Sequence, residues 1–223
     1  MSRSPLEPAL LKYPQVPAGD GTAAAAPVVS AREQAALRFD DLSARPRFGC
    51  KGPGAPAWLA ANGYSVPQGA NSARVDSQGV LVARLATSEF LIEAVGGGAE
   101  GGSASLHQLG WPMGPAGLAA RPLDVYPVAR QDLVVGIQGP GLQTLLRQIC
   151  SVDFVPLFEG CGPHDGPVAL TSMIGVGVVA WPRRTDSGSS LTVWLDPSFA
   201  HYFWTTLLEV GRGVGALVIG SNI

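Results

Sequence analysis

The sequence predicts an α+β fold in which two similar halves of the split-βαβ, ferredoxin-like kind pack together. The tripeptide Gly-Pro-Gly occurs twice, at residues 52–54 and 139–141, each time between an apolar run and a helical pattern. Each helical pattern is followed by a connection and then by two strand-like runs around a turn. When the two tripeptides are aligned, Leu59 lies opposite Leu146. Internal similarity of this kind is typical of a duplicated supersecondary unit.

The composition narrows the classes of protein that the chain can belong to. Its 223 residues, 46% of them hydrophobic, suffice for one large domain or two small fused units. The mean hydropathy of +0.21 leaves two interpretations open, a well-filled core or an apolar surface covered by another chain. A net charge of −2 without a basic cluster argues against nucleic acid binding. No apolar run reaches the length of a membrane span. Three cysteines and the lack of a signal peptide predict a cytoplasmic protein.

The N-terminal residues predict an arm that precedes the folded part. Residues 1–29 are rich in Pro, Ala and Gly without a sustained period, so we expect an extended or disordered arm. Residues 30–39, "SAREQAALRF", predict a short helix that Ser30 can cap. We expect residues 30–223 to form a single domain, with halves at about 45–103 and 121–210.

The first half predicts a strand, a helix and a strand pair. An apolar strand over residues 47–50 leads into Gly-Pro-Gly and then into a helix at about 55–61. Residues 80–85 and 90–95 predict two strands joined by a short turn. The glycine-rich stretch after them predicts a flexible loop.

The second half repeats that pattern. Residues 123–139 predict one or two strands, and residues 172–181 and 191–195 predict a hairpin. The intervening helix has its apolar residues at i, i+3, i+4 and i+7, which predicts one face laid against a sheet; they are Leu142, Leu145, Leu146 and Ile149. A last helix begins after Asp196, whose side chain can cap it.

The two glycine-proline turns allow two interpretations. A phosphate-binding P-loop requires a lysine and a hydroxyl residue after its last glycine, and Gly141 is followed by Leu-Gln-Thr. The glycine spacing also departs from the dinucleotide fingerprint. We therefore interpret all six residues as structural strand-to-helix turns, with an anion at the helix starts as the alternative. These residues are Gly52, Pro53, Gly54, Gly139, Pro140 and Gly141.

The polar residues do not predict an active site on this chain. Cys161 and His164 have the spacing of half a zinc site, but no second pair completes four ligands. His164 and Asp165 are adjacent, and adjacent residues in a turn usually point apart. Asp132 and Asp153 more plausibly cap turns. We predict no catalytic, cofactor-binding or metal-binding residue.

The aromatic residues of the last helix suggest a contact with another chain. Phe199, Tyr202, Phe203 and Trp204 cannot all be buried on one helix face. Aromatic side chains contribute strongly to protein interfaces. We therefore predict that Tyr202 or Trp204 contacts a partner.

Four segments together resemble a known family. They are "RFGCKGPGAPAWLAANGYSVP", "LVARLATSEFLIEA", "ARQDLVVGIQGPGLQTLLRQICSVDF" and "LDPSFAHYFWTTLLEV". In this order they resemble the gamma subunit of heterotetrameric sarcosine oxidase, which is itself similar to the N-terminal region of the aminomethyltransferase (glycine cleavage T-protein) family. The resemblance extends over roughly residues 45–210.

The resemblance implies a subunit without an active site of its own. The complex of that family oxidatively demethylates N-methyl amino acids such as sarcosine, with tetrahydrofolate as the one-carbon acceptor. FAD, FMN, NAD and tetrahydrofolate are then expected on the larger alpha and beta subunits, none on this chain, which would be part of a hetero-oligomer. A stand-alone folate-binding, aminomethyltransferase-like protein is the alternative, and a scaffold domain without ligand is a third.

Overall fold

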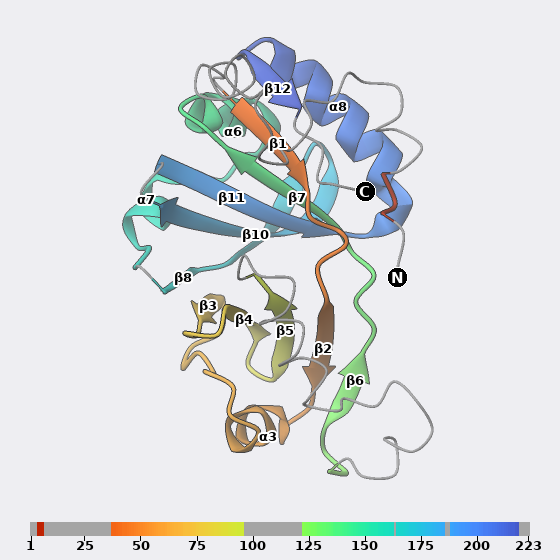
Figure 1. Ribbon diagram of the computed structural model, residues 1–223, viewed down its shortest axis with the longest axis vertical. Coiled ribbons are helices and arrows are strands. Elements are labelled where there is room, and N and C mark those ends of the chain that lie inside the picture. The colour runs from red at the N-terminus through yellow and green to blue at the C-terminus, as the bar shows by residue number, and fades with distance from the viewer. Residues whose placement is uncertain (1–3, 7–36, 96–121, 163, 186–187, 219–223) are drawn as a thin grey trace, which may run out of the picture. The chain divides into compact units, whose positions relative to one another are not determined.

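The computed structural model describes residues 4–6, 37–95, 122–162, 164–185 and 188–218, which fall into two compact units (Figure 1). Unit 1 consists of Met1–Ala44, Gln131–Cys161 and Ala169–Ile223, and unit 2 of Arg45–Arg130 and Gly162–Val168. The units therefore interleave along the chain. The predicted domain limits, 1–29 and 30–223 with two consecutive halves, stay a prediction.

In its described residues, unit 2 is a six-stranded antiparallel sheet with one short helix. The strand order is β6-β2-β5-β4-β3-β8. The elements are β2 (Arg47–Lys51), α3 (Ala55–Ala61), β3 (Ser72–Val75), β4 (Val80–Ala86), β5 (Glu89–Ala94), β6 (Tyr126–Val128) and β8 (Asp165–Pro167). Alternate strand residues such as Phe48, Phe90 and Ile92 form a core with Ala55 and Leu59 of α3. The strands and helix predicted for the first half are confirmed to within two residues.

Unit 1 is a second six-stranded sheet, covered by helices. Its order is β12-β1-β7-β11-β10-β9, and only the β1–β12 pair is parallel. The strands are β1 (Leu37–Asp41), β7 (Leu133–Gln138), β9 (Ala169–Met173), β10 (Val176–Thr185), β11 (Gly188–Leu195) and β12 (Ala216–Val218). The helices are α6 (Leu142–Ile149), α7 (Val155–Glu159), the 3-10 turn η1 (Pro197–Phe199) and α8 (Ala200–Arg212).

The helices of unit 1 bury apolar faces, and the face of α6 is the one that the sequence predicts. All four apolar residues of the i, i+3, i+4, i+7 pattern in α6 are buried. In α8 the buried side chains include Phe203, Trp204 and Leu207. Both helices and the facing strand residues form one apolar core, and Figure 1 shows α8 lying along this sheet. Asp196 accepts a hydrogen bond from the Ser198 amide at 2.8 Å, so the predicted cap is confirmed.

The α+β class is confirmed, with two predominantly antiparallel sheets, but the split-βαβ halves are not. In unit 2, β2 precedes α3 and the strands β3, β4 and β5 follow it; in the sheet these four strands lie in the order β2-β5-β4-β3. In unit 1, the corresponding four strands lie in the order β7-β11-β10-β9. The same strand order thus occurs twice. A split βαβ needs two parallel strands with one strand between them. Here each successive pair is antiparallel, so the strands flanking α3 run in opposite directions with two strands between them.

The N-terminal predictions have mixed outcomes. Residues 37–39 belong to β1, not to the predicted helix, because Arg38 and Phe39 pair with both β7 and β12 in the sheet. Residues 30–36 and most of the predicted arm lie outside the described residues. Of that arm, residues 4–6 are described, and Leu6 is fully buried in the core of unit 1. The predicted glycine-rich loop at 96–105 also lies outside them. No helix in the described part is long and apolar enough to span a membrane.

Candidate functional site

The first Gly-Pro-Gly turn has a backbone geometry that only glycine tolerates at its first position. Gly52 has a φ of +123°. A Cβ atom there would lie 2.2 Å from the backbone oxygen of Asp124, well inside van der Waals contact. The Ala55 amide donates to the Gly52 carbonyl at 3.0 Å, which places Pro53 at the second position of a tight turn. Proline is favoured there because its ring fixes φ near −65°.

The helix start after this turn faces a carboxylate of the chain itself. The Gly54 amide donates to the Asp124 carbonyl at 3.3 Å, and a Cβ on Gly54 would lie 2.3–2.4 Å from the Asp124 carboxylate atoms. An anionic ligand approaching these amides would meet that negative charge. The residues at this turn therefore do not fit a phosphate-bearing cofactor.

The second turn repeats the backbone geometry. Gly139 has a φ of +127°, and the Leu142 amide donates to its carbonyl at 3.1 Å. Gly141 is the N-cap residue of α6. Because glycine has no side chain, no side-chain hydrogen bond caps this helix. Both prolines lie before the N-cap glycine and outside the helix. The structural role assigned to the six residues stays a prediction.

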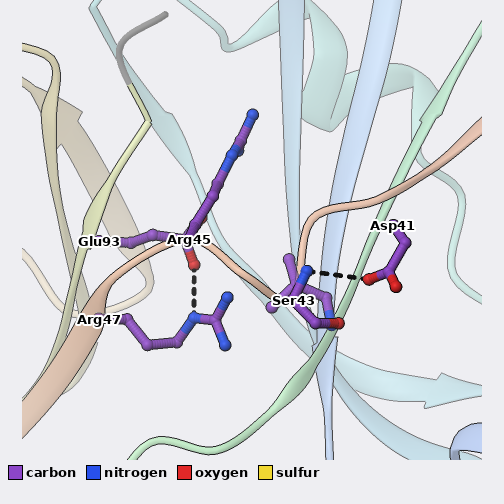
Figure 2. Close-up of polar contacts among 6 residues, drawn as sticks. Asp41, Ser43, Arg45, Arg47 and Glu93 are labelled. Atoms are coloured by element: carbon purple, nitrogen blue, oxygen red, sulfur yellow. Dashed lines mark hydrogen bonds and ion pairs between the residues drawn. The ribbon is translucent and has the colours of Figure 1, made fainter. Parts of the chain in front are cut away.

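A buried ion cluster is the strongest electrostatic feature of unit 2. Glu93 is fully buried, and Figure 2 shows Arg47 extending to it. The Arg47 Nε lies 2.9 Å from Glu93 Oε2, and Arg45 Nη1 lies 3.5 Å from Oε1. The Arg47 side chain is 4% exposed. Charges in such a place are stable only as a pair, because each has lost its hydration.

A polar network in unit 1 holds the residues that follow β1. Asp41 accepts a hydrogen bond from the Ser43 amide at 2.9 Å (Figure 2). Its other carboxylate oxygen accepts one from the Ser4 hydroxyl. Ser43 Oγ accepts the Val134 amide at 3.0 Å, and the Leu42 amide donates to the Val134 carbonyl at 2.8 Å. The network joins the N-terminal tip, β1 and β7.

The cysteine thiols are buried or lie within hydrogen-bonding distance of oxygen atoms. Burial raises the pKa of Cys50 to about 12, so it is not a thiolate nucleophile at neutral pH. The Cys161 thiol lies 3.2 Å from the carbonyl oxygens of Leu157 and Pro182 and can donate to both. Burial, and then the neighbouring Cys50 and Asp76, raise the pKa of Tyr64. Within the described ranges, no three His, Cys, Asp or Glu gather as metal ligands would.

The structure gives contacts for several of the polar candidates named from the sequence. The His164 carbonyl accepts the Val75 amide at 2.7 Å, and Asp165 pairs with Arg74 at 3.9 Å. Asp153 accepts the Val155 amide at 3.0 Å, in the turn that leads into α7.

The structure of the chain, unlike its sequence, matches known proteins. No family model matches the sequence, and neither does any curated protein. A chain of the heterotetrameric sarcosine oxidase from Corynebacterium sp. U-96 matches the structure with a TM-score of 0.66 and 21% identity, over 97% of both chains. The glycine cleavage system aminomethyltransferase T from Bartonella henselae matches with a TM-score of 0.59 and 15% identity. The chain has the fold of these two proteins.

The two matches differ in how much of the other protein they cover. The aminomethyltransferase match covers 89% of this chain but 52% of the transferase chain, so this chain spans about half the length of that protein. The sarcosine oxidase match covers 97% of this chain and 97% of the sarcosine oxidase chain. The suspected resemblance to the sarcosine oxidase and aminomethyltransferase fold is therefore confirmed at the level of fold.

The two aromatic residues predicted to contact a partner have different surroundings in this sarcosine oxidase-like fold. Trp204 is fully buried and packs edge-on against Phe39 at 6.4 Å between ring centroids, so its ring is part of the core of unit 1 and not of its surface. Tyr202 is 51% exposed. Partner contact by Tyr202 stays a prediction.

Sequence reasoning missed the buried Glu93 cluster, the Ser4–Asp41 contact and the turn at Ile174. Glu93 lies in an apolar strand run, and a charge inside such a run is the signal that a paired partner exists. Ile174 has a φ of +53°, which a β-branched residue rarely adopts. The sequence does not indicate that Ile174 has a positive φ. Gly175 alone is enough to suggest a turn at this place, so no unusual angle is expected at the residue before it.

Proposed function

We propose that this chain is the non-catalytic small, gamma-type subunit of a heterotetrameric sarcosine oxidase-like complex. The complex would oxidatively demethylate N-methyl amino acids and pass the one-carbon unit to tetrahydrofolate. FAD, FMN, NAD and tetrahydrofolate would bind to the larger alpha- and beta-type subunits. The chain would act in the cytoplasm, as part of that hetero-oligomer.

The observation that carries this proposal is the extent of the structural match. The chain aligns over 97% of its own length and 97% of a chain from a heterotetrameric sarcosine oxidase. The transferase match extends over only 52% of the transferase. This chain matches the whole of one sarcosine oxidase chain but only about half of the transferase. It is therefore better explained as a subunit than as a complete transferase.

The chemistry of the described residues supports a structural role. The most buried carboxylate, Glu93, faces the guanidinium of Arg47 and cannot serve as a base without breaking that pair. The Cys50 thiol is held protonated by burial. The first glycine-proline turn presents a carboxylate where a cofactor phosphate would need amide donors. These groups stabilise the fold and offer little reactivity.

Reconstitution tests the proposal directly. The full chain is co-expressed with the alpha- and beta-type subunits of a sarcosine oxidase complex, and the preparation is passed over a sizing column. We expect stoichiometric co-elution and sarcosine-dependent oxygen consumption. We also expect the larger subunits alone to form a less stable complex. Elution of this chain by itself at every concentration tested would contradict the proposal.

The aminomethyltransferase match supports one alternative, a stand-alone folate-binding protein. Titrating tetrahydrofolate into the purified chain, while following tryptophan fluorescence, separates the two functions. The subunit proposal predicts no saturable change in the absence of the larger subunits. A saturable change with the chain alone would favour the alternative.

A further inference from the structure

Two of the exposed aromatic side chains lie together at the start of α8. The large apolar side chains that are exposed among the described residues are Leu123, Tyr126, Val152, Leu170, Phe199 and Tyr202. Phe199 is 48% exposed and Tyr202 51% exposed, and they lie three residues apart, on the same side of a helical turn. A single exposed apolar side chain is normal for a protein surface, whereas neighbouring exposed aromatic side chains are less so.

The Tyr202 ring is fixed by a turn with an unusual backbone. Its hydroxyl donates to the Ile174 carbonyl at 3.1 Å. Ile174 and Gly175 form the two-residue connection between β9 and β10, and both have positive φ values, of 53° and 76°. Asparagine is the usual residue at the first of these positions, because its side chain tolerates that conformation. An isoleucine there is strained, and such strain often accompanies a functional surface.

The neighbouring strand and helix hold this strained turn in place. The Ile174 amide donates to the Ile149 carbonyl at the end of α6, at 2.9 Å. Cys150 and Met173 form a β-bridge next to it. Side chains that are fixed before binding lose little conformational entropy when a partner covers them. The turn therefore gives the Tyr202 hydroxyl a well-held acceptor, the Ile174 carbonyl.

We propose that Phe199 and Tyr202, together the Phe199 patch, are the surface against which a larger subunit packs. This inference rests on the function proposed above and names the partner surface. The occupant is an apolar segment of that subunit with a lysine or arginine next to it. Tyrosine and other aromatic residues often dominate the binding energy of such interfaces, and Tyr202 is already oriented.

The charge beside the patch determines the chemistry of the partner. Asp196 is exposed and lies three residues before Phe199. Its hydrogen bonds from Ser198 lower its pKa, so it carries a negative charge at neutral pH. A partner that covers Phe199 comes close to this carboxylate, so a cation there is favoured and a carboxylate disfavoured.

Binding of the full chain to the larger subunits, measured by titration calorimetry, tests the inference. Phe199→Ser should weaken binding at least about tenfold, as loss of an aromatic anchor does. Leu170→Ser is the matched control, because Leu170 is as exposed (54%) but lies on β9, away from the patch. That control should change the affinity less than about twofold, as peripheral contacts do.

A further variant separates a binding role from a folding role. Asp196→Asn keeps a capping side chain and removes the charge, so it should weaken binding at low salt and have little effect at high salt, without lowering the melting temperature of the chain. If the wild-type chain does not bind at all, the proposed function fails. If it binds and Phe199→Ser binds equally well, this inference alone is overturned.

Discussion

Replacing Gly52 with alanine tests whether the first glycine-proline turn is a device for bending the backbone. The new Cβ would lie 2.2 Å from the Asp124 oxygen and 3.0 Å from the Asp124 carbonyl carbon and a ring carbon of Tyr126. The first two are backbone atoms, so no side-chain rotation relieves the clash. The positive φ should lower the free energy of unfolding of Gly52→Ala by about 1–2 kcal/mol, as in left-handed backbone. Forced displacement adds about 1–3 kcal/mol, as in overpacked cores.

Two other glycines separate these contributions. Gly63 has a φ of +84°, and a Cβ there would meet nothing within 4 Å, so Gly63→Ala should show only the backbone term of about 1–2 kcal/mol. Gly54 has a φ of −79°, which suits any residue. The atoms nearest to a Cβ there belong to the Asp124 carboxylate, which can rotate away. We expect Gly54→Ala to change stability by less than about 1 kcal/mol.

Urea denaturation of the three variants, followed by tryptophan fluorescence, gives the comparison. Gly52→Ala should lower the free energy of unfolding by about 2–5 kcal/mol, the sum of the two terms. The loss of unfolding free energy in Gly52→Ala should exceed that in Gly63→Ala by the contribution of the forced displacement, about 1–3 kcal/mol. The reasoning is refuted if Gly52→Ala and Gly63→Ala are equally destabilised, or if Gly54→Ala is the most destabilised of the three.

The remaining predictions concern three buried side chains. Glu93→Gln should lower the unfolding free energy in urea by about 3–5 kcal/mol, because it leaves Arg47 buried without its counter-charge; an unchanged midpoint would contradict this. The free energy of unfolding should fall as pH rises from about 9 toward 12, since the unfolded chain ionises Cys50 before the folded one does. Cys50→Ala should flatten that fall, and an identical pH profile would argue against it. Leu6→Ala should lower the melting temperature, with a loss of up to about 3 kcal/mol for a buried leucine; no change would show that the N-terminal tip is not part of the core.

The periodic elements could be predicted because their patterns are local. The apolar face of α6 and the cap at Asp196 depend on residues within one or two helical turns. The strand β1 was missed because its neighbours, β7 and β12, lie about 100 residues or more away in sequence. An "AALRF" run suits a helix locally, and pairing in the sheet overrides that preference.

The candidate site was only partly predictable. The glycine-proline turns were visible, but the residue that packs on the first of them, Asp124, lies about 70 residues later in the chain. The exposed Tyr202 followed from helix geometry, and Trp204 did not, because both faces of α8 carry aromatic residues and only packing selects between them. The strain at Ile174 depends on a backbone angle that composition does not encode.

The interleaving of the two units has a consequence for how the protein can be made and divided. The chain passes from one unit to the other between residues 44 and 45, 130 and 131, 161 and 162, and 168 and 169. No single cut therefore yields an intact unit. On the ribosome, the sheet of unit 2 must wait for β8, its last strand, until residue 167 has been synthesised. Either unit expressed alone would need two or more segments rejoined by new linkers.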